Sequence, residues 1–267
     1  MWWRSNMPMI KPVFPQLNKS HPLAVGLRGC WMMHENAGQT VSDISGNGNT
    51  GTFSDTAALR WEEGIYGASV RHTVYATGTK YVAVPDSNSL DLGYEMTLIA
   101  IVKFYGEVLD WLNIIQKDAV PDASRPYDFY RDKNTKKLGL RIFSNLGLSN
   151  SASATIELNT WYHVAVTFKS GTTQKYYRDG LAAGTAGPYT LGAPMANTYP
   201  VYLMKLSNGA ISGAWIYDRV LTPQEIALHA SDPFAMARPR QHIWKPTIIR
   251  GVQFNNAINN GFNSRWN

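Results

Sequence analysis

The order of apolar and polar positions along the chain predicts many short strands. Residues 161–168 alternate strictly, and the even-numbered set from Tyr162 to Phe168 is expected to face a core. Residues 96–104 form a longer apolar run rich in β-branched side chains, which is typical of a central, buried strand. The same reasoning predicts further strands at residues 26–33, 81–84, 112–116, 137–143, 174–178, 201–204 and 210–217.

One short helix is expected after the last of these strands. Thr222 offers an N-cap hydroxyl, Pro223 suits the first helical position, and Glu225 completes a capping box. Asp232 and the proline after it should end the helix. Many short strands with a single short helix indicate an antiparallel β-sandwich rather than alternating strands and helices.

The bulk composition agrees with one large all-β domain. The 267 residues are 44% hydrophobic and only 16% charged, with 22 Gly and 14 Pro to form turns. Cys30 is the single cysteine, so no internal disulfide is possible, and we expect it to be a small buried apolar residue. The prolines near the start argue against a secretory signal, and no apolar run is long enough to span a bilayer.

Charge is distributed unevenly along the chain. No acidic residue precedes Glu35 or follows Asp232, and nine of the 25 basic residues lie in these two regions. We therefore expect an extended basic arm over residues 1–22, a sandwich over 23–232 and a second extended basic arm over 233–267. Basic residues mixed with tryptophans suit docking on another surface, and packing back on the same domain is the alternative. The predicted docking residues are Trp2, Trp3, Arg4, Arg238, Arg240, Trp244, Lys245, Arg250 and Trp266.

Candidate catalytic residues are sparse. A glycoside hydrolase needs two carboxylates that face one groove, but Glu62 and Glu63 are adjacent and would point to opposite faces of a strand. His163 lies within the alternating strand, and the six histidines show no metal-ligand spacing. We therefore expect a protein that binds rather than catalyses, with no catalytic residue.

Several motifs occur in an order that resembles laminin-G-like jelly-roll domains. They are an "L-x-x-x-W … D-x-S-G-x-x-N-x-G" opening at residues 27–31 and 41–51, a "W-x-H-V-A" strand at 161–165, a "Y-x-D-G" hairpin at 177–180, and a closing strand and helix at 211–226. Lys80 and the Leu203-Met204 pair depart from the pattern. The resemblance implies a concanavalin A-like fold, an antiparallel two-sheet jelly-roll sandwich with one short C-terminal helix.

Two ligand types are considered for this fold. Related domains often bind calcium, and Asp43 with Asn47 could offer oxygen ligands, although Asp43 could equally cap a tight turn, which we favour. Binding a glycan requires an aromatic platform and fixed polar groups. The predicted glycan-binding residues are Trp111, Tyr127, Tyr130 and Arg131, which could equally fill the core or its rim.

The leading functional hypothesis is a structural binding protein anchored by its arms. The opening motif and residues 233–240 resemble phage-type proteins, so we expect a virion surface component, either a capsid decoration or a tail-associated protein, that forms a homo-oligomer and contacts other virion proteins. A free carbohydrate-binding lectin, located in the cytoplasm, is the alternative. Nucleic acid is not an expected partner, because the arms lack dense Lys/Arg clusters and prolines interrupt any helix.

Overall fold

The computed structural model describes residues 9–72, 80–107, 111–117, 126–142, 150–190 and 197–238. In these ranges the strands are β1 (Leu27–Trp31), β2 (Thr40–Val41), β3 (Gly51–Phe53), β4 (Leu59–Gly64), β5 (Gly67–His72), β6 (Val82–Val84), β7 (Glu95–Gly106), β8 (Trp111–Lys117), β9 (Tyr127–Asp132), β10 (Lys137–Arg141), β11 (Asn150–Thr155), β12 (Tyr162–Lys169), β13 (Thr172–Arg178), β14 (Leu181–Tyr189), β15 (Val201–Leu203) and β16 (Asn208–Tyr217). The helices are η1 (Pro22–Ala24), η2 (Asn88–Leu90), α1 (Pro223–Ser231) and η3 (Ala235–Ala237).

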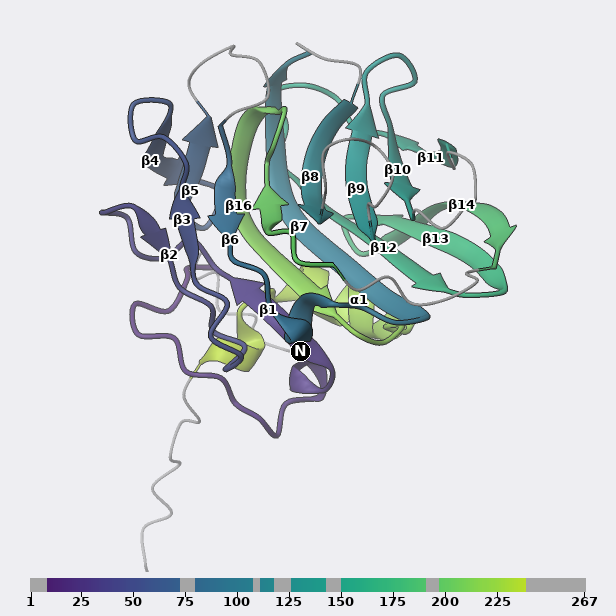
Figure 1. Ribbon diagram of the computed structural model, residues 1–267, viewed down its shortest axis with the longest axis horizontal. Helices are drawn as coiled ribbons and strands as arrows, with labels where there is room; N and C mark the ends of the chain where they lie inside the picture. Colours follow the sequence, from purple (N-terminus) through teal and green to yellow (C-terminus); the bar gives the residue numbers. More distant parts are fainter. Residues whose placement is uncertain are drawn as a thin grey trace, which may run out of the picture.

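The strands form two antiparallel sheets that face each other (Figure 1). Sheet A has the order β14-β13-β12-β7-β16-β5-β4, with β1 also paired to β16. Sheet B has the order β11-β10-β9-β8-β15-β6-β3-β2. The predicted jelly-roll sandwich is therefore confirmed, and in the described ranges no helix is long and apolar enough to cross a bilayer.

The main core lies between the sheets. Val164, Val166 and Phe168 of β12 contribute to it, as the alternation predicts. They pack with the even-numbered residues of β7, from Met96 to Phe104, because β12 and β7 pair in register along their whole common length. Both strands lie in the middle of sheet A, which explains why the longest apolar run of the sequence forms β7.

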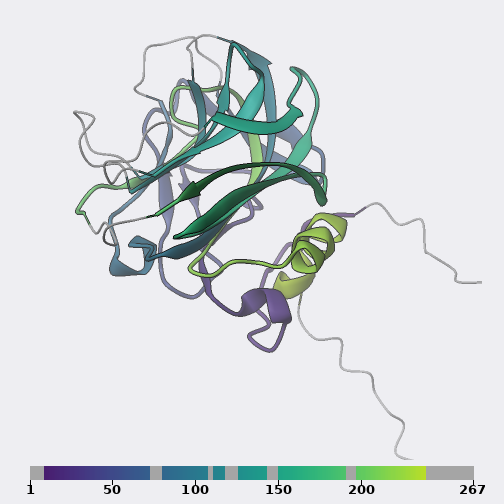
Figure 2. The ribbon, with the colours of Figure 1, turned by 90° about the vertical axis from the view of Figure 1, so that its right-hand side faces the viewer.

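The outer face of sheet A carries a second apolar layer. The remaining residues of its central strands include Ile99, Ala165, Trp215 and Tyr217, and all of them are buried. Leucine and isoleucine side chains from η1 and α1 cover them, together with Phe234, Met236 and Ala237 that follow α1. Figure 2 shows α1 and η1 on the same flank, outside the two sheets. The central part of sheet A is thus covered on both faces.

Helix α1 forms as the capping residues predict. The Thr222 hydroxyl accepts a hydrogen bond from the Glu225 N–H at 3.2 Å, and the Glu225 carboxylate accepts one from the Thr222 N–H at 2.8 Å. Arg219 binds the same carboxylate from the end of β16 at 2.8 Å. This pairing, more than any other contribution, keeps the pKa of Glu225 below its usual value. The reciprocal cap fixes the point at which the chain leaves sheet A and turns back over it.

Some strands carry too few apolar residues to be predicted. The hairpin of β4 and β5 contains Glu62 and Arg71, which pair at 3.3 Å, and Glu62 also accepts a hydrogen bond from the Tyr105 hydroxyl. All six residues of β9 are buried, including Asp128 and Arg131. In such strands ion pairs and cross-strand hydrogen bonds replace the apolar alternation that reveals a strand in sequence.

The described parts of both predicted arms lie on the sandwich. Residues 9–20, here called the N-terminal strap, donate backbone hydrogen bonds from Lys11 to Tyr66, from Gln16 to Ala237 and from Asn18 to Met236, at 3.3, 3.0 and 2.7 Å. Residues 233–238 complete the second apolar layer. Residues 1–8 and 239–267 lie outside the described ranges.

Lys11 fastens the strap in an unusual way. Its side chain is only 6% exposed, and its ammonium group donates hydrogen bonds to the carbonyls of Met33 and Ala68. Burial lowers the pKa of Lys11 from 10.5 to about 7, although the carboxylate of Glu35 opposes this change. The folded protein therefore binds this proton much more weakly than the unfolded chain does.

Lys11→Met should remove this penalty while retaining the packed side chain. Between pH 7 and pH 10 the unfolded chain holds more protons at Lys11, so this residue makes wild-type stability rise with pH by up to about 1.4 kcal/mol per pH unit. The variant should lack this component and be the more stable protein at pH 7. Urea unfolding of both proteins across this window measures the difference, and parallel stability curves would refute the assignment.

Candidate functional site

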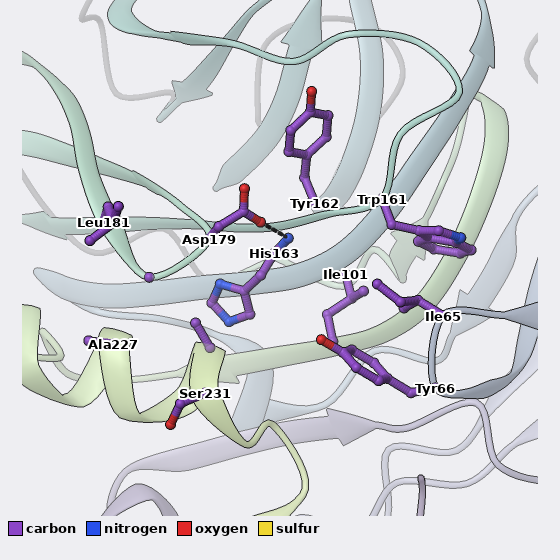
Figure 3. Close-up of a pocket in the computed structure, with 12 residues that line it drawn as sticks. Ile65, Tyr66, Ile101, Trp161, Tyr162, His163, Asp179, Leu181, Ala227 and Ser231 are labelled. Atoms are coloured by element: carbon purple, nitrogen blue, oxygen red, sulfur yellow. Dashed lines mark hydrogen bonds between the residues drawn. The ribbon is translucent and has the colours of Figure 1, made fainter. Parts of the chain in front are cut away.

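A cleft opens on the outer face of sheet A, where the second apolar layer ends (Figure 3). It has a volume of about 280 Å³ and lies between α1, the turn from β4 to β5, the start of β12 and the turn from β13 to β14. Trp161, Ile65 and Tyr66 form one side, and His163, Asp179 and Leu181 form the other. The opening combines aromatic surface with a few polar groups, which is typical of small-ligand sites.

The alternation of β12 explains why these side chains meet. Because even-numbered residues face the main core, Trp161 and His163 project to the outer face of sheet A. Ile101 lies beside them, because it is the cross-strand partner of His163 on β7. Helix α1 covers His163 but leaves Trp161 half-buried at the rim. One strand therefore supplies both the floor of the cleft and its aromatic edge.

Asp179 is held in place by the turn between β13 and β14. Its backbone has φ +52° and is followed by Gly180 at φ +80°. A side chain at position 180 would place its Cβ atom 2.9 Å from that of Ala230 on α1, so glycine is needed for this close approach. Oδ1 of Asp179 accepts a hydrogen bond from the backbone N–H of His163 at 3.0 Å (Figure 3). The carboxylate is thus oriented by β12 while its side chain remains 54% exposed.

Two buried histidines lie beneath the cleft. Nε2 of His163 is 2.9 Å from Nδ1 of His229 on α1, so one ring donates the shared proton and the other accepts it. The Trp215 ring meets His229 edge-on at a centroid distance of 4.5 Å. Burial lowers the pKa of His163 to about 4, and burial together with the neighbouring His163 also holds the pKa of His229 well below its usual value. Both rings are therefore neutral at pH 7.

The aromatic side of the cleft is continuous with the second apolar layer. The Tyr66 ring meets the buried Phe234 ring edge-to-face at 5.6 Å, which fixes Tyr66 at the cleft wall. Partial burial raises the pKa of the Tyr66 phenol, with smaller contributions from the carboxylates of Asp179 and Asp232. The phenol therefore stays protonated at neutral pH and can donate a hydrogen bond into the cleft.

The described lining of the cleft carries few ionisable side chains. Asp179 is the one carboxylate among the described residues that line the cleft, whereas glycoside hydrolysis ordinarily uses a pair. His163 is neutral and deeply buried, which makes it a weak general base at pH 7. What the site offers is an aromatic surface beside a rigid hydrogen-bond acceptor.

The predicted glycan-binding residues occupy a different part of the molecule, on β8 and β9 of sheet B. Trp111 is 37% exposed, whereas Tyr127, Tyr130 and Arg131 are completely buried. The Tyr127 hydroxyl donates to the Leu90 carbonyl, and Arg131 binds the Ile156 carbonyl and the Glu107 carboxylate at 2.7 Å each. The structure thus leaves Trp111 as the one exposed side chain of the predicted platform.

Trp111 is itself part of a stacked cluster. The guanidinium group of Arg141 lies over the rings of Trp111 and Tyr130, at 4.5 and 4.7 Å from their centroids. Arg141 also pairs with the buried carboxylate of Asp128, which accepts a hydrogen bond from the Asn113 amide at 2.6 Å. One face of the Trp111 ring is therefore occupied by a side chain of its own sheet.

The candidate calcium ligands form a turn network. Oδ1 of Asp43 accepts hydrogen bonds from the N–H groups of Cys30 and Ser45, and Oδ2 accepts from the Ser45 hydroxyl and the Asn49 N–H, all at 2.7–2.9 Å. The Asn47 amide donates to the carbonyls of residues 27 and 28. This is the arrangement expected of a capped turn. Among the described residues no group of three or more His, Cys, Asp or Glu side chains could hold a metal ion. Calcium binding itself stays a prediction.

Of the predicted docking residues, Arg238 is described, and it pairs with Asp232 of its own chain. The other predicted docking residues lie outside the described ranges, and their role stays a prediction: Trp2, Trp3, Arg4, Arg240, Trp244, Lys245, Arg250 and Trp266.

The two-sheet jelly roll is a lectin-like fold. Residues 76–227 match the laminin-G-like family profile described as the concanavalin A-like lectin/glucanases superfamily, so the chain belongs to this superfamily. No curated protein sequence matches the chain.

Solved structures share the fold at low sequence identity. The binding domain of Paraclostridial Mosquitocidal Protein 1 has a TM-score of 0.62 and 15% identity, over 80% of this chain and 53% of that one. Domain 4 of AbnA, a GH43 extracellular arabinanase from Geobacillus stearothermophilus, in complex with arabinotriose, has a TM-score of 0.58 and 18% identity, over 76% of this chain and 98% of that domain. Trypanosoma rangeli sialidase has a TM-score of 0.57 and 16% identity, over 80% of this chain and 34% of the sialidase. The chain thus spans about half of the first structure and a third of the sialidase.

Two sequence motifs contain cleft residues that sequence reasoning did not predict as a site. Trp161 and His163 belong to the "W-x-H-V-A" motif, and Asp179 belongs to the "Y-x-D-G" motif. Pairing the two strands in register places Asp179 beside His163. The position of α1 cannot be read from these motifs, and it is α1 that turns a flat sheet face into a cleft.

The histidine pair should make the protein sensitive to acid. Below pH 6.5 the unfolded chain binds protons at His163 that the folded protein binds only near pH 4, so the free energy of unfolding falls through this window. The expected loss from His163 is about 3 kcal/mol. The double variant His163→Gln/His229→Gln cannot titrate there and should lose less stability between pH 6.5 and 4. Equal losses in the two proteins, measured by thermal and urea unfolding, would contradict the pair's role.

Proposed function

We propose that the chain is a non-enzymatic, carbohydrate-binding module whose sugar ligand lies in the cleft of Figure 3. The observation that carries the proposal is the half-buried Trp161 ring on one side of the cleft and the fixed carboxylate of Asp179 on the other. A sugar presents apolar C–H faces and hydroxyl groups, so it needs an aromatic surface and a few oriented polar atoms. The cleft provides both within one small volume.

The rigidity of the site favours binding of a small polar ligand. Asp179 is fixed by its turn and by β12, and Tyr66 is fixed by its contact with Phe234. Side chains that are already ordered lose little conformational entropy when a ligand arrives.

The comparison with the arabinanase domain supports the same class of ligand. Domain 4 of AbnA was solved with arabinotriose, and 98% of it is covered by this chain. The resemblance concerns the fold, since 18% of residues are identical. The support for the ligand class therefore rests on the fold, and the support for the site rests on the residues of the cleft.

Trp161→Ala should weaken sugar binding about tenfold or more, because it removes the aromatic surface. Trp111→Ala is the matched control, since it removes an exposed tryptophan from sheet B. A glycan array followed by calorimetry with the best ligand, in calcium and in EDTA, measures both effects. Loss of binding in Trp111→Ala alone would overturn the assignment of the cleft and support the sequence-based platform.

We also infer that the N-terminal strap attaches the module to a larger protein assembly. Ile10, Val13 and Phe14 of the strap are 60%, 75% and 83% exposed. The backbone hydrogen bonds of Lys11 and Gln16 hold this segment on both sides of Val13 and Phe14. A fixed segment that presents large apolar side chains to solvent is typical of a protein interaction site. A virion surface is the assembly that we propose, with homo-oligomer formation as part of it.

Val13→Ser/Phe14→Ser should therefore reduce association with the native assembly. Val25→Ser is a suitable control, because Val25 is also 60% exposed but lies outside the strap. Co-sedimentation with particles purified from the source, together with the sedimentation velocity of the isolated protein, measures attachment and self-association. A double variant that co-sediments as well as the control would refute a docking role for the strap.

A further inference from the structure

The geometry points to a cleft that selects amino sugars, which carry a protonated amine, over neutral and acidic sugars. This inference rests on the proposed function and names the substrate class of the same site. Three features of the cleft lead to it: the negative charge of its lining, the partners that the neighbouring cations bind, and its aromatic side chains.

The cleft has a negative charge and lacks a positive one in its lining. Asp179 is the one charged side chain among the described residues that line it. Oδ1 of Asp179 is used by the His163 N–H, and the carboxylate is exposed enough to accept a further hydrogen bond. An ammonium group can donate to this acceptor and form a charge-assisted hydrogen bond. A ligand carboxylate would instead meet a like charge.

The neighbouring cations have other partners as well. Nε of Arg178 lies 4.0 Å from Oδ2 of Asp179, which is a long ion-pair distance, and its Nη1 donates to the Thr155 carbonyl at 2.9 Å. Arg238 is paired with Asp232, a second carboxylate that acts on Tyr66 together with Asp179. His163 and His229 are neutral at pH 7. Among the described residues, Asp179 is therefore only weakly compensated by cations.

The aromatic walls favour a cation as well. In Figure 3, the rings of Trp161 and Tyr66 border the opening on one side. The faces of aromatic rings attract ammonium groups, and the attraction grows as water is excluded. The same rings pack against the C–H face of a sugar. A ring that carries both a C–H face and an ammonium group matches the cleft better than either feature alone.

The expected selectivity is modest, because Asp179 is half-exposed and salt screens its charge. A glucosamine oligomer should bind about tenfold more tightly than an N-acetylglucosamine oligomer of the same length at pH 6 and low salt. An oligomer of galacturonic acid should bind more weakly than both. The advantage of the amine should shrink in 0.5 M salt and at a pH where the amine is neutral.

Calorimetric titration of the full chain with these three oligomers tests the inference. Asp179→Asn retains the acceptor for the backbone N–H of His163 and removes the charge, so glucosamine and N-acetylglucosamine oligomers should bind this variant with equal affinity. Glu63→Gln is the matched control, because Glu63 is an exposed carboxylate on neighbouring β4 that does not line the cleft. It should leave the preference unchanged.

The outcomes separate the two levels of the proposal. If no oligomer and no glycan on an array binds, the proposed carbohydrate function fails together with this inference. If sugars bind but the amine gives no advantage, or if Asp179→Asn keeps that advantage, this inference alone is overturned. A lysine-rich peptide that binds as tightly as the glucosamine oligomer would also overturn it, because the cleft would then recognise ammonium groups without the sugar.

Discussion

The structure depends on covering the outer face of sheet A. Its central strands present Trp215, Tyr217 and Ile99 on the side opposite the main core, and this apolar area has to be removed from water. Helix α1 and the segments beside it provide the cover from both ends of the chain. The sandwich is thus stabilised by three layers, and the third contains residues of the two predicted extended arms.

The same constraint explains the position and character of the cleft. Cover by α1 ends between His163 and Trp161, two residues apart on one strand face, so the first is buried and the second reaches the rim. The buried ring loses its proton affinity, whereas the rim keeps an aromatic surface next to water. A site that combines apolar contact with one oriented carboxylate therefore arises where a structural layer stops, and no loop dedicated to binding is needed.

The sequence predicted the architecture well because periodicity is a local property. The alternation around Val164 and the capping box of Thr222 each depend on neighbours within a few positions, and both are confirmed. The prediction of a platform at Tyr127 and Tyr130 relied on residue type alone, and type does not distinguish an aromatic ring on a surface from one in a core. The cleft joins residues from β7, β12, β14, α1 and the turns β4–β5 and β13–β14, and this proximity follows from how α1 packs, which no local pattern encodes.

The backbone bonds of Gln16 and Asn18 to Ala237 and Met236 have a further consequence. The segment that leads into the sandwich and the segment that leaves it therefore lie side by side, at about the distance between two paired strands. Such an arrangement is compatible with insertion into a surface loop of a host protein without separating the two sides of that loop. The fold therefore suits a domain that is inserted within another protein as well as a domain that is attached at its end.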